Sequence, residues 1–133
     1  MQQSDYLKCD ATTLAHHVAT GEVSANELLG CALAQSARVN PKTNAICRLM
    51  EDEARKQLTD LSQRPQGTFA GVPFLIKDGV QDYAGIPTSY GSQSMLRFTP
   101  QEHAAVVRRY LGAGLVIFGK TNLPEFALKS VTD

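Results

Sequence analysis

Two lysines follow apolar runs, and they are the side chains in this sequence best placed to do chemistry. Lys77 ends the run in GVPFLIKDG, residues 71–79, and Lys120 follows LVIF and Gly119. A lysine held in surroundings of low polarity loses hydration, which lowers its pKa and makes a neutral amine available as a general base. Lowering the pKa of a lysine from its ordinary value to near neutral pH requires a shift of about three units, which corresponds to a free-energy difference of about 4 kcal/mol between its two protonation states. Position alone leaves Lys77 as either a candidate base or a surface charge, and we expect Lys120 to be a solvated residue of a turn.

Other reactive residue types give weaker patterns. The stretch GAGLVIFGKT, residues 112–121, only faintly suggests a phosphate-binding loop. GSQS, residues 91–94, does not match the G-x-S-x-G motif, so neither Ser92 nor Ser94 is favoured as a nucleophile. Three histidines lie at no spacing typical of metal ligands, and we expect them on helix surfaces: His16, His17 and His103. We therefore expect neither a metal nor a cofactor.

Length and charge limit the class of protein. A chain of 133 residues fits one domain, and its 13 basic side chains balance its 13 acidic ones. Without a net positive charge, nucleic acid and membrane surfaces are not expected partners. Cys9, Cys31 and Cys47 lack C-x-x-C spacing, which argues against disulfides and zinc. No apolar run approaches the roughly twenty residues that span a bilayer, and the first residues lack a signal-peptide pattern. We therefore expect a cytoplasmic protein with reduced thiols.

Residues 1–62 are expected to be mainly helical, with one strand. Asp10 is placed to cap a short helix. Ser24 and Glu27 form the capping-box pattern of a longer helix, which we expect to end at the NP dipeptide, residues 40–41. Three further segments follow: a strand at residues 45–49, a charged helix at residues 51–63 with Ala54, Leu58 and Leu61 facing inward, and a loop at residues 64–67.

The second half of the chain is expected to form a right-handed βαβ unit. Continuous apolar runs at residues 72–76 and 115–118 are typical of strands covered on both faces. A crossover helix between them makes the two strands parallel. Ligands of such sheets bind beyond the carboxyl ends of the strands, where both Lys77 and Lys120 lie. Because side chains alternate along a strand, Lys77 and the aspartate directly after it project to opposite faces and need not pair.

A long loop and two capped helix starts are expected within and after this unit. Residues 78–98, rich in Gly, Pro, Ser and Thr, are expected to form a long loop, and loops of that length are typically functional. Thr99 and Glu102 have the pattern of a capped helix start, so we expect the crossover helix to begin there. A last short helix is expected near the end of the chain, with Asn122 or Thr121 as its cap.

Three segments, GVPFLIKD, AGIPTSYGS and AAVVRRYLGAGLVIFGKTNLPEFAL, follow one another over residues 71–128. Their order and approximate spacing resemble those of the amidase signature family, the serine hydrolases that cleave carboxamides. The resemblance implies an α/β fold, in which a mixed, mainly parallel sheet is covered by helices and N-terminal helices precede the βαβ unit. Residues 1–133 would be the N-terminal portion of one amidase domain, with residues 1–62 as its lead-in and residues 71–133 carrying the catalytic lysine.

The resemblance also implies a mechanism. The family's catalytic lysine ends the G-x-P-x-x-x-K-D stretch, which here is Lys77, and Asp78 belongs to its supporting shell. In the family's Ser-cisSer-Lys triad, the lysine accepts a proton through a serine in a cis peptide bond while a second serine attacks the amide carbonyl. Both serines lie downstream of the GKTN segment in the family, so we expect the present chain to be a fragment that is inactive alone. Gly79 and His103 depart from the residues common at their positions in the family.

Three hypotheses remain open from the sequence. The first is hydrolysis of a small-molecule or peptide-like amide by the complete enzyme, with Lys77 as the general base. The second is a glutaminase subunit of a transfer-RNA amidotransferase, an activity that the family includes. The third is a non-catalytic βαβ binding module in which Lys77 is an edge charge. No direct nucleic-acid partner and no membrane partner are expected, and the sequence does not decide between a monomer and a homo-oligomer.

Overall fold

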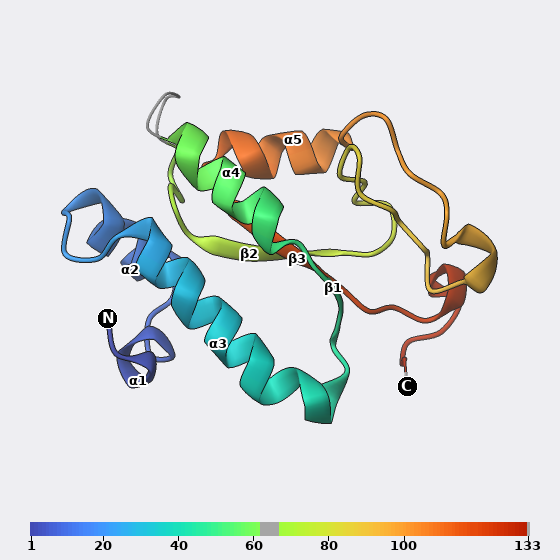
Figure 1. Ribbon diagram of the computed structural model, residues 1–133, viewed down its shortest axis with the longest axis horizontal. Helices are drawn as coiled ribbons and strands as arrows, with labels where there is room; N and C mark the ends of the chain where they lie inside the picture. The colour runs from blue at the N-terminus through green and yellow to red at the C-terminus, as the bar shows by residue number, and fades with distance from the viewer. Residues whose placement is uncertain (62–66, 133) are drawn as a thin grey trace.

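The computed structural model describes residues 1–61 and 67–132, and at its centre lies a three-stranded sheet with the strand order β1-β3-β2 (Figure 1). β2 (Pro73–Lys77) runs parallel to β3 (Val116–Thr121), which confirms the predicted pairing. β1 (Ile46–Leu49), in the segment predicted as a strand, pairs with β3 in the antiparallel direction. The fold is therefore mixed α/β, as expected, and β3 is its central strand.

Helices cover both faces of this sheet. On one face, α3 (Ala25–Thr43) and α4 (Glu51–Leu61) pack against the central strand, and on the other face α5 (Ala105–Gly112) does so. The first contact is built from Leu29, Ala32, Ala54, Val116 and Phe118, and the second from Met50, Ile76, Tyr83, Val107 and Ile117. Because both faces of β3 meet apolar partners, its sequence is a continuous hydrophobic run rather than an alternating one.

Capping side chains begin the helices of the lead-in where the sequence predicts. α2 (Ala11–Ala19) follows Asp10, whose carboxylate accepts a hydrogen bond from the Thr13 N–H at 2.8 Å. α3 follows Ser24, and the Glu27 N–H donates to Ser24 Oγ at 3.2 Å while the Ser24 N–H donates to Glu27 Oε2 at 2.9 Å. The Glu27 carboxylate accepts from the Ser24 N–H and, at 2.8 Å, from the Ser24 hydroxyl, and these bonds, with the terminal amine 3.1 Å away, lower the pKa of Glu27 to about 2.

The end of α3 lies beyond its predicted position. The helix continues to Thr43 with Pro41 inside its last turn. Proline removes only its own N–H from the ladder, and the N–H of Asn44, in the left-handed region at φ 47°, still donates to the Asn40 carbonyl at 2.8 Å. The Asn40 side chain also makes two hydrogen bonds to the backbone of Ile46, which tie the helix end to β1.

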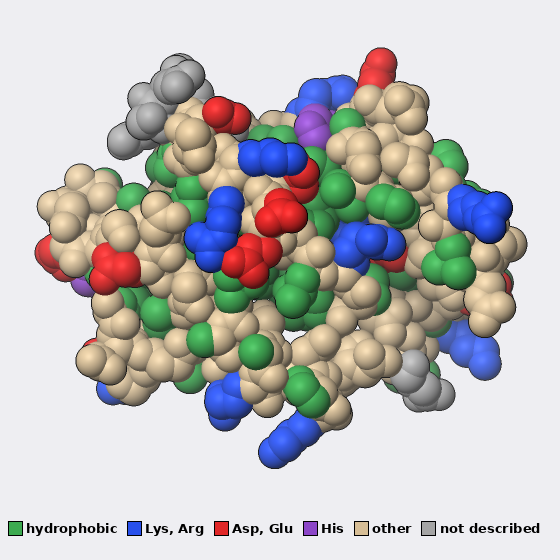
Figure 2. Space-filling model, viewed as in Figure 1, with side chains coloured by type: hydrophobic (Ala, Val, Ile, Leu, Met, Phe, Trp, Pro, Cys, Tyr) green, Lys and Arg blue, Asp and Glu red, His purple; other side chains and the backbone are tan. Residues whose placement is uncertain are grey.

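α4 combines a charged outer face with a polar anchor. Ion pairs three or four residues apart line the exposed face, and Figure 2 shows acidic and basic side chains gathered over this helix. Ala54 and Leu58 face the core as predicted. Gln57 is also buried, and its amide bonds both the N–H and the C=O of Ile117, at 2.8 and 2.9 Å. It satisfies the backbone of β3 at a position that β1 does not pair.

The crossover helix begins later than predicted. α5 starts at Ala105, and Thr99 Oγ1 donates to the Arg97 carbonyl instead of capping a helix. Residues 98–104 pair with the loop before them through backbone hydrogen bonds: Gly85 to Pro100, Thr88 to Phe98 and Ala104 to Asp82. This pairing removes the segment from a helical conformation and folds residues 78–98 over the end of the sheet. These residues form a long loop as predicted, apart from the single 3-10 turn η1 (Gln93–Met95).

β3 extends further than predicted. It reaches Thr121 rather than Phe118 because neighbouring strands pair with it on both sides. Lys120 and Thr121 are thus strand residues, not turn residues. The predicted helix after them is a single turn, η2 (Glu125–Ala127), preceded by Pro124 without a side-chain cap. Asn122 Oδ1 accepts from the Leu123 N–H instead, so the predicted cap was wrong.

α1 (Gln3–Tyr6) is a short helix that no sequence pattern indicates. Residues 62–66 are not described, so most of the loop predicted at residues 64–67 lies outside the described part of the chain. All three cysteines are free, and no helix within residues 1–61 and 67–132 is long and apolar enough to cross a membrane.

Candidate active site at the strand ends

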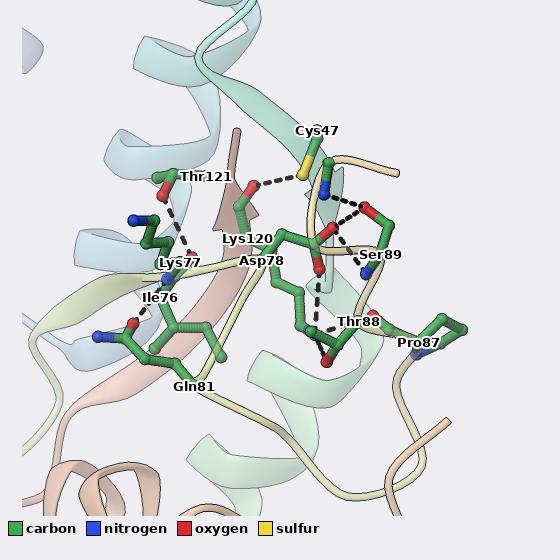
Figure 3. Close-up of polar contacts among 11 residues, drawn as sticks. Cys47, Ile76, Lys77, Asp78, Gln81, Pro87, Thr88, Ser89, Lys120 and Thr121 are labelled. Atoms are coloured by element: carbon green, nitrogen blue, oxygen red, sulfur yellow. Dashed lines mark hydrogen bonds and ion pairs between the residues drawn. The ribbon is translucent and has the colours of Figure 1, made fainter. Parts of the chain in front are cut away.

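Lys77 is the last residue of β2, at the carboxyl end of the parallel strand pair. Its backbone N–H donates to Gln81 Oε1 at 2.6 Å. Its side chain is half-buried, and no hydrogen bond or ion pair joins its amine to another of the described residues. Figure 3 shows the amine on the side of Thr121 and directed away from Asp78. The residue predicted as a general base therefore presents a free amine at the edge of the sheet.

Lys120 has the opposite surroundings, although it also lies at a strand end. Its side chain is 0% exposed. The amine donates to the Pro87 carbonyl at 2.8 Å and to Thr88 Oγ1 at 2.7 Å, and it lies 3.3 Å from Asp78 Oδ1. The expectation of a solvated turn residue was wrong, because the loop of residues 78–98 folds over this strand end and supplies oxygen atoms in place of water.

Asp78 joins both strand ends to this loop. Its side chain is 5% exposed. Besides the ion pair with Lys120, its Oδ2 accepts from the N–H of Ser89 at 3.1 Å and from the Ser89 hydroxyl at 2.5 Å (Figure 3). Its backbone N–H donates to the Thr121 carbonyl at 3.0 Å, and its own carbonyl accepts from the Tyr90 N–H at 3.0 Å. A buried carboxylate needs a charge partner and hydrogen bonds, and Asp78 has both.

A register shift between β2 and β3 places the two lysines on different faces of the sheet. Phe74 is paired with Ile117, but the next residue, Leu75, is paired with Gly119, so β3 contributes one extra residue. An extra residue in one strand moves every later side chain of that strand to the other face. Without the shift, Lys120 would share the face of Phe118, under α3 and α4.

After the register shift, the amines of Lys77 and Lys120 lie on opposite faces of the sheet. Lys120 is paired with Ile76 and lies on its face, with Asp78 and the covering loop. Lys77 is paired with Thr121 and lies on the other face. The prediction that Lys77 and Asp78 project oppositely is confirmed, since the carboxylate pairs with Lys120 instead.

Burial changes the acidity of two groups around Asp78. It lowers the pKa of the Lys120 amine, whereas the charge of Asp78 and its hydrogen bond act to raise that pKa. Burial, and next the charge of Asp78, raise the pKa of the Cys47 thiol, whose Sγ lies 3.5 Å from the Lys120 carbonyl oxygen. A raised pKa favours the thiol over the thiolate, which disfavours Cys47 as a nucleophile.

Residues 114–121, GLVIFGKT, match the letters of the G-x-x-x-x-G-K-T phosphate loop without forming one. A phosphate loop curls around the anion and offers it free backbone N–H groups. Here residues 116–121 form the central strand, and Lys120 is engaged with Asp78. The segment therefore does not have the geometry of a phosphate site.

Ser92, Ser94 and His103 make hydrogen bonds within the fold. Ser92 Oγ donates to Glu125 Oε1 at 2.6 Å and lies 2.9 Å from Ser94 Oγ. His103 lies before α5 rather than on a helix surface, and its Nδ1 accepts from the Ala84 N–H at 3.0 Å. In the described part of the chain, no group of three His, Cys, Asp or Glu residues could hold a metal ion.

A groove of about 220 Å³ opens on the Lys77 face, between α3 and the strands. Its walls include Leu75 and Thr121, which are neighbours of Lys77 along and across the sheet. Neither wall residue is a nucleophile held against the lysine, and among the described residues no serine hydroxyl bonds the Lys77 amine. The site thus offers an unpaired amine, and any proton that it exchanges must come from or go to a group outside the described residues or to solvent.

Comparison with known proteins identifies relatives of the whole segment. The sequence model of the Amidase family matches residues 27–133. A glutamyl-tRNA(Gln) amidotransferase subunit from Lactiplantibacillus plantarum is 33% identical over 131 residues, which are 96% of this chain and 27% of the relative.

Two solved structures share the fold. A 6-aminohexanoate cyclic dimer hydrolase superposes with a TM-score of 0.80 at 35% identity, over 89% of this chain and 24% of its own. The native peptide amidase of Stenotrophomonas maltophilia does so with a TM-score of 0.80 at 32% identity, over 91% of this chain and 26% of its own. The chain spans about a quarter of the length of the relatives that it matches.

Proposed function

Because this chain belongs to the amidase signature family, we propose that it supplies the general base, Lys77, of an enzyme that hydrolyses the carbon–nitrogen bond of an amide. The observation that carries the proposal is the free, half-buried amine that ends β2, in the G-x-P-x-x-x-K-D stretch. The other lysine of the sheet, Lys120, is enclosed and held by three oxygen atoms, so it is not available to a substrate.

The proposed proton path is the one that the family resemblance implies, and the free Lys77 amine is compatible with it. In this proposal the Lys77 amine accepts a proton from a bridging serine, which in turn takes one from a nucleophilic serine, and both serines lie outside residues 1–133. The nucleophilic oxygen then bonds to the amide carbonyl carbon, the carbon–nitrogen bond breaks, and the leaving amine takes up the proton. Water hydrolyses the acyl-serine and releases the acid, while backbone N–H groups stabilise the oxyanion.

Asp78 has a supporting role in this proposal. It does not contact the Lys77 amine but anchors the backbone directly after it, through Ser89, Thr121 and Tyr90. We place the enzyme in the cytoplasm, a proposal supported by its three free cysteines. A small-molecule or peptide-like amide is the proposed substrate, supported by similarity to a cyclic dimer hydrolase and a peptide amidase.

The test uses the complete protein, isolated from its native source or expressed from the reading frame that contains residues 1–133. Lys77→Ala is expected to reduce turnover of an amide substrate by about a thousandfold, because a positioned base contributes roughly 10²- to 10⁴-fold. Lys56→Ala, at an exposed lysine of α4, is the matched control and should leave turnover unchanged. Normal turnover by the Lys77→Ala protein would refute the proposal, and absence of any amide hydrolysis by the complete protein would favour the binding-module hypothesis.

A glutaminase subunit is the second candidate function. It is supported by the 33% identity to the glutamyl-tRNA(Gln) amidotransferase subunit over 96% of this chain. Glutamine hydrolysis by the complete protein, with partner subunits from the same source, is the discriminating assay. Turnover of other amides without release of ammonia from glutamine would dismiss this candidate and keep the first.

A further inference from the structure

The ion pair of Lys120 and Asp78 connects three segments that are distant in sequence. Lys120 comes from the central strand, and Asp78 directly follows β2. The loop contributes the Pro87 carbonyl and the Thr88 hydroxyl to the lysine, and the N–H and hydroxyl of Ser89 to the aspartate. The two charges therefore hold one another and also hold the loop across both strand ends (Figure 3).

Lys77 is flanked by residues of this network, but its amine bonds none of them. The residue before it, Ile76, is paired with Lys120, and the residue after it is Asp78. Its own N–H is held by Gln81. No described residue bonds its amine, so the direction in which the side chain leaves the sheet is set by the backbone on either side of it.

We propose that Lys120 is a positioning residue for Lys77: its buried amine, through Asp78, fixes the strand end from which the Lys77 amine enters the opposite face. The inference rests on the proposed role of Lys77 as the base. It assigns a function to a residue whose amine is enclosed and bonded to Pro87, Thr88 and Asp78. A base displaced by about 1 Å can lose roughly a hundredfold in rate, so the backbone anchor is expected to affect catalysis strongly.

The positioning role of Lys120 can be distinguished from a simple packing defect by its effect on the pH dependence of turnover. Lys120 and Asp78 neutralise one another, and Asp82 and Arg48 are the other charged groups that act on the Lys120 amine. Removing Lys120 leaves an unpaired negative charge on Asp78, the residue directly after Lys77, which favours the protonated form of the base. Removing the charge of Asp78 leaves a positive one, which disfavours it. The pH midpoint of turnover should therefore move upward in one variant and downward in the other.

The experiment compares three variants of the complete enzyme. Lys120→Met and the isosteric Asp78→Asn are each expected to lower kcat by about thirtyfold or more while KM stays within about threefold, because substrate contacts are intact. Their pH midpoints should shift in opposite directions. The exposed Lys56→Met is the control and should change neither. Urea unfolding establishes that each variant is folded at the assay temperature.

Separate outcomes bear on the two proposals. A folded Lys120→Met protein with kcat within about threefold of the parent would overturn the positioning role. Midpoints that move in the same direction, or do not move, would assign the loss to a packing defect and equally overturn it. If Lys120→Met does not fold, Asp78→Asn decides by the same criteria. Retained turnover by Lys77→Ala would instead refute the proposed function itself, whatever the Lys120 variants show.

Discussion

A lysine lies near the carboxyl end of both β2 and β3, but the two amines have opposite surroundings. Lys77 is half-buried with a free amine, whereas Lys120 is fully enclosed and paired with Asp78. Both follow apolar runs, and both stand at the carboxyl edge of the sheet, where ligands of parallel sheets bind. This edge of the sheet therefore offers more than one candidate for chemistry, and the face of the sheet decides which amine stays unpaired.

One face of the sheet is covered at the strand ends, and the other is open. On the Ile76 face, the loop of residues 78–98 replaces water with protein oxygens around Lys120. On the other face, a groove extends beside Leu75 and Thr121, and the Lys77 amine has no described partner. A buried charge with fixed partners suits the role of an anchor, while a base must exchange protons with a substrate-side group.

The largest expected difference between the two strand ends is in amine reactivity. With an amine-acylating reagent at about pH 8, Lys77 should react at least about a hundredfold faster than Lys120, because Lys120 must first be exposed by local opening. Peptide mapping by mass spectrometry gives both rates in one sample, with the exposed Lys56 as reference. In denaturant the ratio should disappear. Equal rates in the native protein would contradict the enclosure of Lys120.

The second difference is in stability. Lys120→Met should lower the free energy of unfolding by about 3–5 kcal/mol, because it leaves the carboxylate of Asp78 buried without its partner. Lys77→Met should change it by less than about 0.5 kcal/mol, because no described residue bonds the amine. Urea titration measures both. The double variant Lys120→Met/Asp78→Leu should lose less than Lys120→Met alone, since it leaves no lone charge, and a larger loss would contradict this account.

Local signals in the sequence were sufficient for much of the framework. The Asp10 cap and the Ser24 capping box depend on residues within one helical turn, and both helices begin where these residues predict. The apolar runs around β2 and β3 reflect coverage on both faces, which also predicts their parallel pairing. The position of Lys77 at a strand end followed from the same runs.

The surroundings of Lys120 could not be predicted because they depend on long-range pairing. One extra residue in β3, before Gly119, reverses the face of the later residues of that strand, and no feature of the β3 sequence alone fixes that register. The covering loop is closed by bonds between residues 82–88 and 98–104, which also moved the start of α5 away from Thr99. Gln57 was missed for the same reason, since its partner Ile117 lies 60 residues away.

A third difference concerns the glutamines that hold each strand. Gln57 satisfies two buried backbone groups of β3, whereas Gln81 satisfies only the N–H of Lys77 on β2. Gln57→Ala should therefore cost about 2–3 kcal/mol of unfolding free energy and Gln81→Ala about 1 kcal/mol. Urea titration of both variants tests the order, with Lys56→Ala as the exposed control on α4. The reverse order would mean that β2, not β3, is the more firmly anchored strand.

The smallest expected effect is a pH dependence in the loop that covers Lys120. Burial, and next the charge of Arg108, lower the pKa of His103, whose neutral Nδ1 accepts from the Ala84 N–H. The unfolded chain therefore binds a proton more readily than the folded one, so this contribution is complete above about pH 6.5 and declines as the pH falls toward the lowered folded value. Hydrogen exchange of the Ala84 amide, corrected for its intrinsic pH dependence, should accelerate between about pH 7.5 and about pH 5.5, while the amide of Asp78 stays protected. His103→Gln keeps an acceptor that does not titrate and should remove the trend; a trend that persists would place the titrating group elsewhere in the loop.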